Sequence, residues 1–184
     1  YRTSAPKIVF TGTMGYRPNV DAVSWFVAEV MPRLRAGGGV SPEFHIVGAN
    51  PSAAVRALAS QPDVHVTGTV PDVRPYIAHA TVSVAPLRIA RGIQNKVLEA
   101  MAMARPVVAT PQAFEGVRAT PGRDLLVAAD AAQTAQRVAE VISGQHAGLG
   151  AAGQAAVTVG HVWEAALQRL DAAMATASLR LASG

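Results

Sequence analysis

The chain has 184 residues, of which half are hydrophobic and 15% are charged, a composition that excludes an intrinsically disordered protein. It contains no cysteine, which excludes disulfide scaffolds, zinc–thiolate sites and cysteine nucleophiles and fits a reducing compartment. The net charge is only +4, carried by scattered arginines without interleaved aromatic residues, so nucleic-acid binding is disfavoured.

Short apolar runs alternate with segments of helical periodicity along the chain. Runs that predict β-strands cover 7–11, 44–48, 64–68, 81–86, 106–110 and 125–128. Segments that predict helices are 19–36, with Asn19 as its N-cap, 51–60, 73–80, 95–103 and 131–142. A glycine-rich patch at 144–153 precedes a further helix, expected over 160–180, with an apolar stripe that begins at Trp163.

This alternation predicts an α/β fold, a Rossmann-like three-layer α/β/α domain with a parallel sheet of about six strands. No internal repeat or low-complexity linker interrupts it, so residues 1–184 are expected to form a single domain. Ligands of such sheets bind beyond the carboxyl ends of the strands. The loops expected there are 12–18, 48–51, 68–72, 87–94 and 110–116.

One of these loops leads into the most informative segment, Gly92 to Thr110. A polar turn opens a helix that carries Lys96 and Glu99, and a short apolar strand follows. A helix N-terminus favours anions, the lysine adds a cation, and the carboxylate can accept two hydroxyl hydrogen bonds. The combination suggests a nucleotide, although a surface ion pair worth at most about 1 kcal/mol is the ordinary structural alternative.

Two further loops have both a binding and a structural interpretation. The first, with Gly12, Thr13, Gly15 and Arg17, fits a phosphate or sugar cradle or an ordinary turn, and its spacing matches neither a dinucleotide fingerprint nor a P-loop. Val70 and Pro71 could approach a base edge, or belong to a turn capped by Asp72.

The sequence shows no complete set of catalytic residues. It has no nucleophile elbow and no paired carboxylates in a clear role. Its five histidines lack metal-ligand spacing, and His45 and His65 are expected to be structural because they lie inside apolar β-runs. A binding half therefore fits the pattern better than a self-sufficient enzyme.

Two stretches resemble a known family. Leu98–Ala109 (Leu-Glu-Ala-Met-Ala, then Arg-Pro-Val-Val-Ala) and the preceding Gly-Ile-Gln-Asn-Lys-Val are similar to the signature helix and strand of retaining glycosyltransferases of GT-B fold. This is the group called glycosyl transferases group 1, family four. The segment Phe10–Val23 resembles the start of that family's C-terminal domain. The resemblance covers nearly the whole chain and is nearest to sugar transferases of bacterial exopolysaccharide systems.

The resemblance implies one half of a two-domain enzyme that transfers a sugar, with retention, from a nucleotide-diphosphate sugar to a glycan or lipid-linked acceptor. The chain matches the donor-binding half; its partner would be an N-terminal acceptor domain of the same protein, without which it would be inactive. Because the chain opens at Tyr1, without Met, we expect it to be part of a longer protein. The resemblance further implies no metal, no tightly bound cofactor and no nucleic acid. Its implied location is the cytoplasm, at the inner membrane face, with peripheral association through the other half.

Site roles follow from the same resemblance. Lys96 and Glu99 would be the catalytic pair, with Glu99 holding the donor ribose. The remaining implied donor-binding residues are Gly12, Thr13, Gly15, Arg17, Val70, Pro71, Arg88, Gly92, Ile93, Gln94 and Asn95. Lys96, with help from Arg17 or Arg88, would stabilise the leaving diphosphate.

The chain also departs from the family pattern. Arg91 stands where the motif has its first glutamate, and Thr13 and Pro18 replace a diphosphate-binding arginine and lysine. Two other interpretations therefore stay open: a nucleotide-sugar-binding module that lacks catalysis, and a GT-B-type nucleotide-sugar epimerase. An epimerase should carry its own acidic and histidine catalytic groups, and this sequence shows no such set.

Overall fold

The computed structural model describes residues 5–37 and 41–160. Within them, parallel strands form one sheet in the order β3-β2-β1-β4-β5-β6. The strands are β1 (Lys7–Thr11), β2 (Glu43–Val47), β3 (Val64–Gly68), β4 (Val82–Ala85), β5 (Val107–Ala109) and β6 (Leu126–Val127). The predicted α/β fold with a parallel sheet is therefore confirmed.

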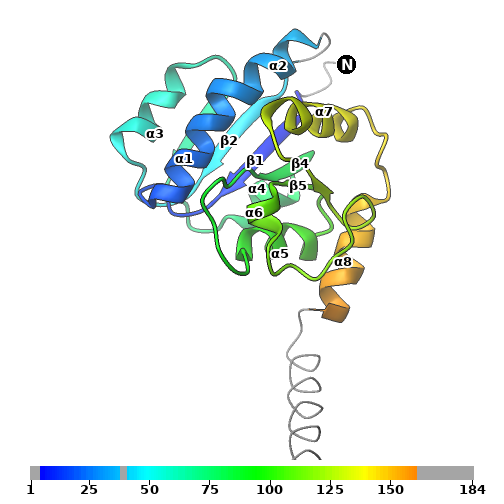
Figure 1. The fold of residues 1–184 in the computed structure, drawn as a ribbon. Helices are drawn as coiled ribbons and strands as arrows, with labels where there is room; N and C mark the ends of the chain where they lie inside the picture. The colour runs from blue at the N-terminus through cyan, green and yellow to red at the C-terminus, as the bar shows by residue number, and fades with distance from the viewer. Residues whose placement is uncertain (1–4, 38–40, 161–184) are drawn as a thin grey trace, which may run out of the picture.

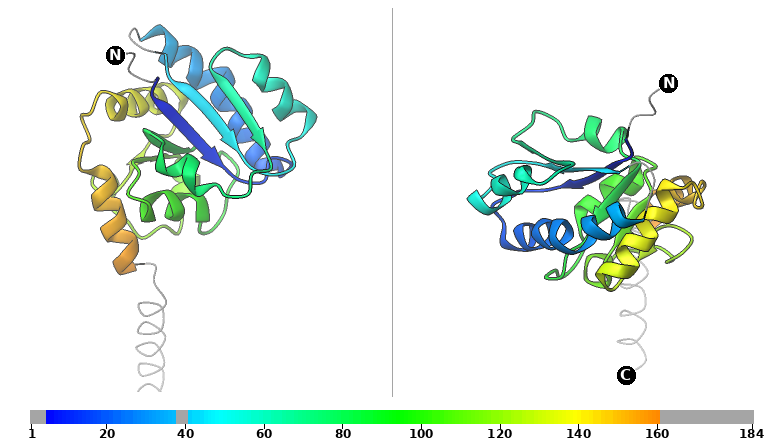
Figure 2. Two further views of the ribbon diagram at one scale, coloured as in Figure 1. Left: turned by 180° about the vertical axis from the view of Figure 1, so that it is seen from behind. Right: turned by 90° about the horizontal axis from the view of Figure 1, so that it is seen from above.

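Helices cover both faces of this sheet. They are α1 (Arg17–Trp25), the π-helical turn η1 (Phe26–Val30), α2 (Met31–Ala36), α3 (Ala53–Ala57), the 3₁₀ turn η2 (Leu58–Ser60), α4 (Arg74–Ala78), α5 (Asn95–Ala102), α6 (Pro111–Phe114), α7 (Ala131–Ile142) and α8 (Leu149–Gly160). α1, α2 and α7 lie on one face, and α4 and α5 lie on the other (Figure 1 and Figure 2). Across the described ranges, no helix has the length and apolar character needed to cross a bilayer.

The larger core cluster fills the space under α1 and also includes the buried side chains of α5. Ile8, Phe10 and Phe44 point to this face and are fully buried, and the ring of Phe26 contacts that of Phe44 at a centroid distance of 4.5 Å. On the opposite face Val9 and Val47 belong to a smaller cluster with residues around α4. The sheet is therefore packed on both sides, but more thinly beneath the five-residue helix α4.

Asn19 does not cap the first helix, contrary to the sequence prediction. The N-cap is Tyr16, and Asn19 lies in the first turn with only 5% of its surface exposed. The helix starts earlier because Pro18, whose φ is suited to a first helical turn, lies inside it. Asn19 is therefore free to make tertiary contacts.

The glycine-rich patch was predicted to precede a helix, yet α8 begins inside it, at Leu149. Its glycines permit close packing: a Cβ at Gly150 would lie 2.1 Å from the carbonyl oxygen of Ala104, and one at Gly153 would lie 2.6 Å from that of Asp124. The short helix α6 was not predicted. The predicted helix over 160–180, with Trp163, lies outside the described residues apart from Gly160.

Two glycines let the ends of β1 and β2 meet. Gly48 has φ +146°, a conformation that is essentially restricted to glycine, and Gly12 donates its N–H to the carbonyl of Val47 at 3.1 Å. A Cβ at Gly48 would lie only 1.8 Å from the carbonyl oxygen of Gly12. The two loops can approach each other only without a side chain here.

The first prediction tests this contact. Gly48→Ala should lower the free energy of unfolding by about 3 kcal/mol, because it combines backbone strain with a steric clash. Urea denaturation measures the change. The control is Gly148→Ala, whose Cβ meets nothing within 4 Å. Equal stability of the two variants would contradict the prediction.

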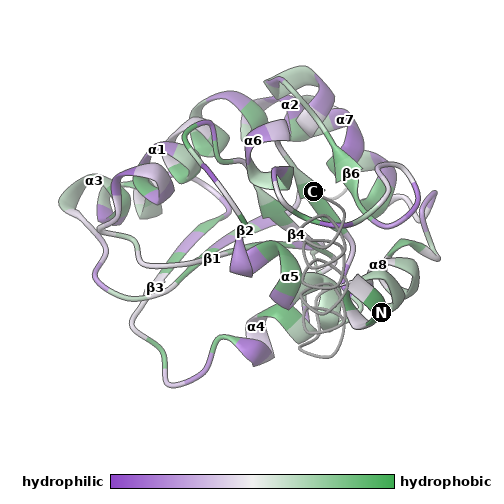
Figure 3. Ribbon diagram, turned by 60° about the horizontal axis from the view of Figure 1, so that its bottom comes forward, coloured by the Kyte–Doolittle hydropathy of each residue, from purple (hydrophilic) through white to green (hydrophobic). Residues whose placement is uncertain are grey.

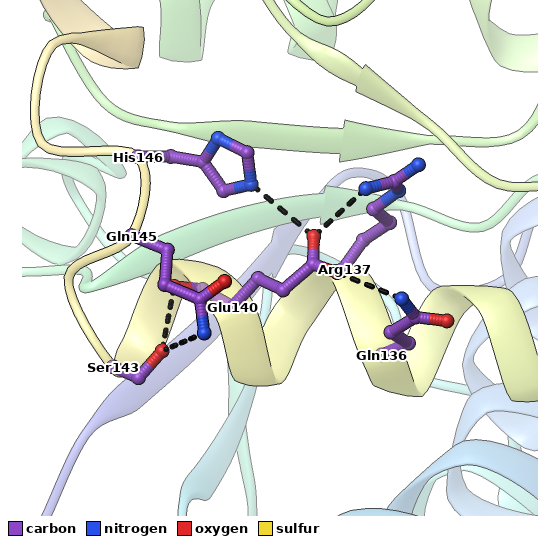
Figure 4. A network of polar contacts seen from close by, with 6 residues as sticks. All are labelled: Gln136, Arg137, Glu140, Ser143, Gln145 and His146. Carbon is purple, nitrogen blue, oxygen red and sulfur yellow. Dashed lines mark hydrogen bonds and ion pairs between the residues drawn. The ribbon is translucent and has the colours of Figure 1, made fainter.

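A polar network fastens the end of α7 to the following loop (Figure 4). Glu140 accepts hydrogen bonds from Arg137 at 2.9 Å and from Gln136 at 2.8 Å, and its carboxylate lies 3.2 Å from Nε2 of His146. These contacts, with Arg137 the largest, lower the pKa of Glu140 from its ordinary 4.5 to about 2. The carboxylate form is therefore favoured by folding.

A carboxyl group whose pKa is lower in the folded than in the unfolded chain stabilises the fold at pH values above its unfolded-state pKa. This contribution is lost as the pH falls through the folded-state pKa. Glu140→Gln should therefore reduce stability at pH 7 by up to about 1 kcal/mol, and the difference from the unchanged protein should shrink between about pH 4.5 and 2. Urea denaturation across this range measures it. The control is Glu115→Gln, at an exposed position, which should leave the stability at pH 7 unchanged.

Candidate functional site

A cavity of about 480 Å³ opens at the carboxyl ends of β1, β2 and β3. The strand order reverses between β1 and β4, so this edge is the topological switch point of the sheet. Figure 3 turns this edge forward, where β1, β2 and β4 meet α4 and α5. The lining residues are Thr11, Gly12, Thr13, Asn19, Gly48, Ala49, Thr69, Val70, Val73, Ile93, Gln94, Asn95, Lys96 and Glu99.

Most of the residues predicted to bind a ligand come together in this cavity. Those that line it are Gly12, Thr13, Val70, Ile93, Gln94, Asn95, Lys96 and Glu99. Those predicted but not among the lining residues are Gly15, Arg17, Pro71, Arg88 and Gly92. The structure thus joins three loops and one helix into a single site, while the binding role of each residue stays a prediction.

The guanidinium of Arg88 is engaged elsewhere. Its Nε donates to a carboxylate oxygen of Asp21 at 3.0 Å, and its Cζ lies 5.7 Å from the centroid of the Trp25 ring. Both partners belong to α1. In this conformation Arg88 ties the loop after β4 to α1, and a role at the diphosphate would require the ion pair with Asp21 to open.

The N-terminus of α5 opens on the cavity. Its N-cap is Gln94, which makes no capping hydrogen bond with its side chain. The Gln94 amide instead donates to the carbonyls of Arg91 and Gly92 at 3.3 and 3.2 Å, which holds the preceding turn. The positive end of the helix dipole is therefore left for an anion in the cavity.

Lys96 extends from this first turn across the edge of the sheet. Its Nζ donates to Oδ1 of Asn19 at 2.6 Å and lies 4.2 Å from the centroid of the buried Phe10 ring. Burial lowers the pKa of Lys96 from 10.5 to about 8, and the nearby charge of Glu99 partly opposes this shift. The ammonium is therefore partly desolvated, and an incoming anion would stabilise it.

Sequence reasoning missed Asn19 as a member of the site. Its Nδ2 donates to the carbonyl oxygen of Thr13 at 2.9 Å while Oδ1 accepts from Lys96, so one buried amide fixes both the first loop and the lysine. A Cβ at Gly12 would lie 2.7 Å from the same Nδ2. The signal in the sequence was an asparagine directly after Pro18, which also fits a helix cap.

Glu99 lies one helical turn beyond Asn95 and is exposed at the cavity. Within the described part of the chain its carboxylate has no hydrogen bond or ion pair with another side chain. It can therefore accept hydrogen bonds from a ligand. A cation, a helix N-terminus and a free carboxylate in one cavity of this size suit a phosphorylated ligand that carries a diol.

Residues 5–144 match the family described as glycosyl transferases group 1. The chain belongs to this family. No curated protein has a sequence that matches it. The match covers all strands of the sheet and the whole cavity, so the glycosyltransferase family is established by the same residues that build the site.

Solved glycosyltransferases share the fold. TarM superposes with a TM-score of 0.72 at 13% identity, over 92% of this chain and 35% of TarM. Sucrose-phosphate synthase from Thermosynechococcus elongatus gives 0.70 at 20% identity, over 96% of this chain and 46% of the enzyme. The C-terminal domain of LpcC, a group 1 family protein from Francisella tularensis, gives 0.67 at 15% identity, over 83% and 84%. The chain thus spans less than half of the first two proteins.

The third prediction concerns Asn19. Asn19→Ala should lower the pKa of Lys96 below about 8, because the charged form loses its hydrogen bond, and Asn19→Asp should raise it, because a carboxylate favours the ammonium. ¹³C NMR of lysine-labelled protein can measure both, since the sequence contains just two lysines. The Lys7 signal is the internal reference. A titration midpoint of Lys96 that is the same in both variants and in the unchanged protein would contradict the assigned contact.

Proposed function

We propose that the chain is the donor-binding half of a glycosyltransferase and binds a nucleotide-diphosphate sugar in the cavity at the carboxyl edge of the sheet. The observation that carries the proposal is the placement of Lys96 beside the uncapped N-terminus of α5, with Glu99 one turn farther along the same helix. Lys96 and the helix N-terminus can bind phosphate, and Glu99 can accept hydrogen bonds from hydroxyl groups.

The proposed pose follows from the chemistry of the lining. The diphosphate would lie against the N–H groups at Gln94 and Asn95 and beside the ammonium of Lys96. The ribose hydroxyls would donate to Glu99. The base would lie toward Val70, at the loop after β3.

Complexes of structural neighbours support a nucleotide as the ligand. HepE from Anabaena, which shares 12% identity and a TM-score of 0.65 with this chain, has been solved with UDP and glucose. A TarM mutant from S. aureus has been solved in complex with UDP among other ligands.

The proposed chemistry breaks the bond between the anomeric carbon and the diphosphate, so negative charge develops on the leaving phosphate. A preorganised cation and helix N–H groups stabilise that charge. Lys96 is held in place for this by Asn19. Arg17 and Arg88 do not line the cavity, so Lys96 is the cation that we assign to the leaving group.

The proposal extends to the whole protein. An N-terminal domain would supply the other wall of the cleft and bind a glycan or lipid-linked acceptor, with transfer at retained configuration in polysaccharide synthesis. Neither a metal nor a tightly bound cofactor takes part in this scheme. Association with the inner membrane face, through the other half, would bring a lipid-linked acceptor within reach.

The fourth prediction tests donor binding by calorimetry with UDP, GDP and ADP and their sugars. Lys96→Met should weaken the nucleotide that binds by more than tenfold, and Glu99→Gln should weaken it less, because a charge-assisted hydrogen bond becomes a neutral one. Since the ligand favours charged Lys96, affinity should be highest below about pH 8 and fall as pH rises above it. Lys96→Met should lack this pH dependence.

Lys7→Met and Glu115→Gln are matched controls outside the cavity and should bind as the unchanged chain does. Unchanged affinity of both site variants would contradict the proposed pose. In the full-length protein, Lys96→Met should also reduce kcat by about 10²–10³. Donor binding without any transfer by the full-length protein would identify a catalytically inactive binding module instead.

A further inference from the structure

Three side chains with metal-binding atoms meet on the sheet face beneath α4. The parallel register pairs His45 of β2 with His65 of the edge strand β3, so both imidazoles project from the same face. Glu43 precedes His45 by two residues on β2 and therefore shares that face. The ligand atoms of all three lie within 4.8 Å of one another.

The contacts within the trio are close. Nε2 of His45 lies 3.0 Å from Oε2 of Glu43, and the His45 and His65 rings stack with centroids 4.7 Å apart. The His45 side chain is 17% exposed and that of Glu43 is 32% exposed, while His65 is exposed. An ion could therefore enter from solvent and still be held by partly buried ligands.

The short helix over this face of the sheet explains why polar side chains can occupy it. A parallel sheet normally carries aliphatic side chains on both faces. On this face α4 has only five residues, and the apolar cluster beneath it contains Val9 and Val47. His45 pairs with Val9 of this cluster and shares a pocket with Pro75 and Tyr76 of α4. The helix still leaves Glu43 and His45 half-buried and His65 exposed, so their polar atoms stay open to a ligand from solvent.

We propose that Glu43, His45 and His65 bind a divalent transition-metal ion, with zinc as the reference ion, and that the ion fastens edge strand β3 to β2. Two imidazoles and one carboxylate form a common zinc ligand set, with water in the fourth position. Tetrahedral coordination places ligand atoms about 3.3 Å apart, so the stacked rings must turn slightly as the ion enters.

The site is separate from the donor cavity. None of its three residues lines that cavity, which lies at the carboxyl ends of the strands, whereas Glu43 is the first residue of β2. The proposed ion therefore has a structural role and takes no part in glycosyl transfer. Lys7, which pairs with Glu43 across β1 and β2, places a positive charge on the same face and limits the affinity for the ion.

The test measures thermal unfolding of the chain after treatment with EDTA, with and without added ZnCl₂ and in the absence of nucleotide. Zinc should raise Tm by about 5 °C, because an ion that binds only the folded state stabilises it. His65→Asn should abolish the rise. His146→Asn removes an imidazole outside the trio and should keep the full response.

Cobalt gives an independent readout, since Co²⁺ in such a site absorbs visible light. The unchanged chain and His146→Asn should show this band, and His65→Asn should not. The Tm of His65→Asn without metal verifies that it folds. If zinc leaves the Tm of the unchanged chain where it was, or raises that of His65→Asn equally, the metal site is refuted, while the proposed donor site is unaffected.

Discussion

One hydrogen bond across the edge of the sheet organises the candidate site. Lys96 belongs to α5 on one face and Asn19 to α1 on the other, and their 2.6 Å contact passes over the end of β1. The ring of Phe10 lies beneath the ammonium, and burial of the group lowers the pKa of Lys96 to about 8. The ammonium of Lys96 is thus held at a fixed position and has already lost part of its hydration. An anion that binds there therefore meets a preorganised charge.

The remainder of the edge has to fit around this bond. Gly12 and Gly48 bring the loops after β1 and β2 into backbone contact, because a side chain at either position would strike the neighbouring loop or Asn19. The turn before α5 is fixed by the Gln94 amide, which leaves the helix N-terminus open. Binding of an anion requires both a rigid scaffold and an open anion position, and this division of hydrogen bonds provides them.

Much of the fold could be predicted from the sequence because strand and helix periodicities are local. The strands at 7–11 and 64–68 and the helix at 131–142 were predicted with the bounds that the structure shows. Errors arose where tertiary contacts overrode local preference. Gly150 and Gly153 suggested a break, but they lie in α8 because only glycine permits that approach to neighbouring backbone.

The sequence alone determined the fold class, the family resemblance and the helix that carries Lys96 and Glu99, since each depends on residues adjacent in the chain. Only the tertiary structure decided which partners those residues have. It joined Asn19 to Lys96, directed Arg88 to Asp21 and set His45 beside His65, contacts that depend on strand register and on which side chains reach across the sheet edge. Such contacts connect residues far apart in the chain, and no local pattern records them.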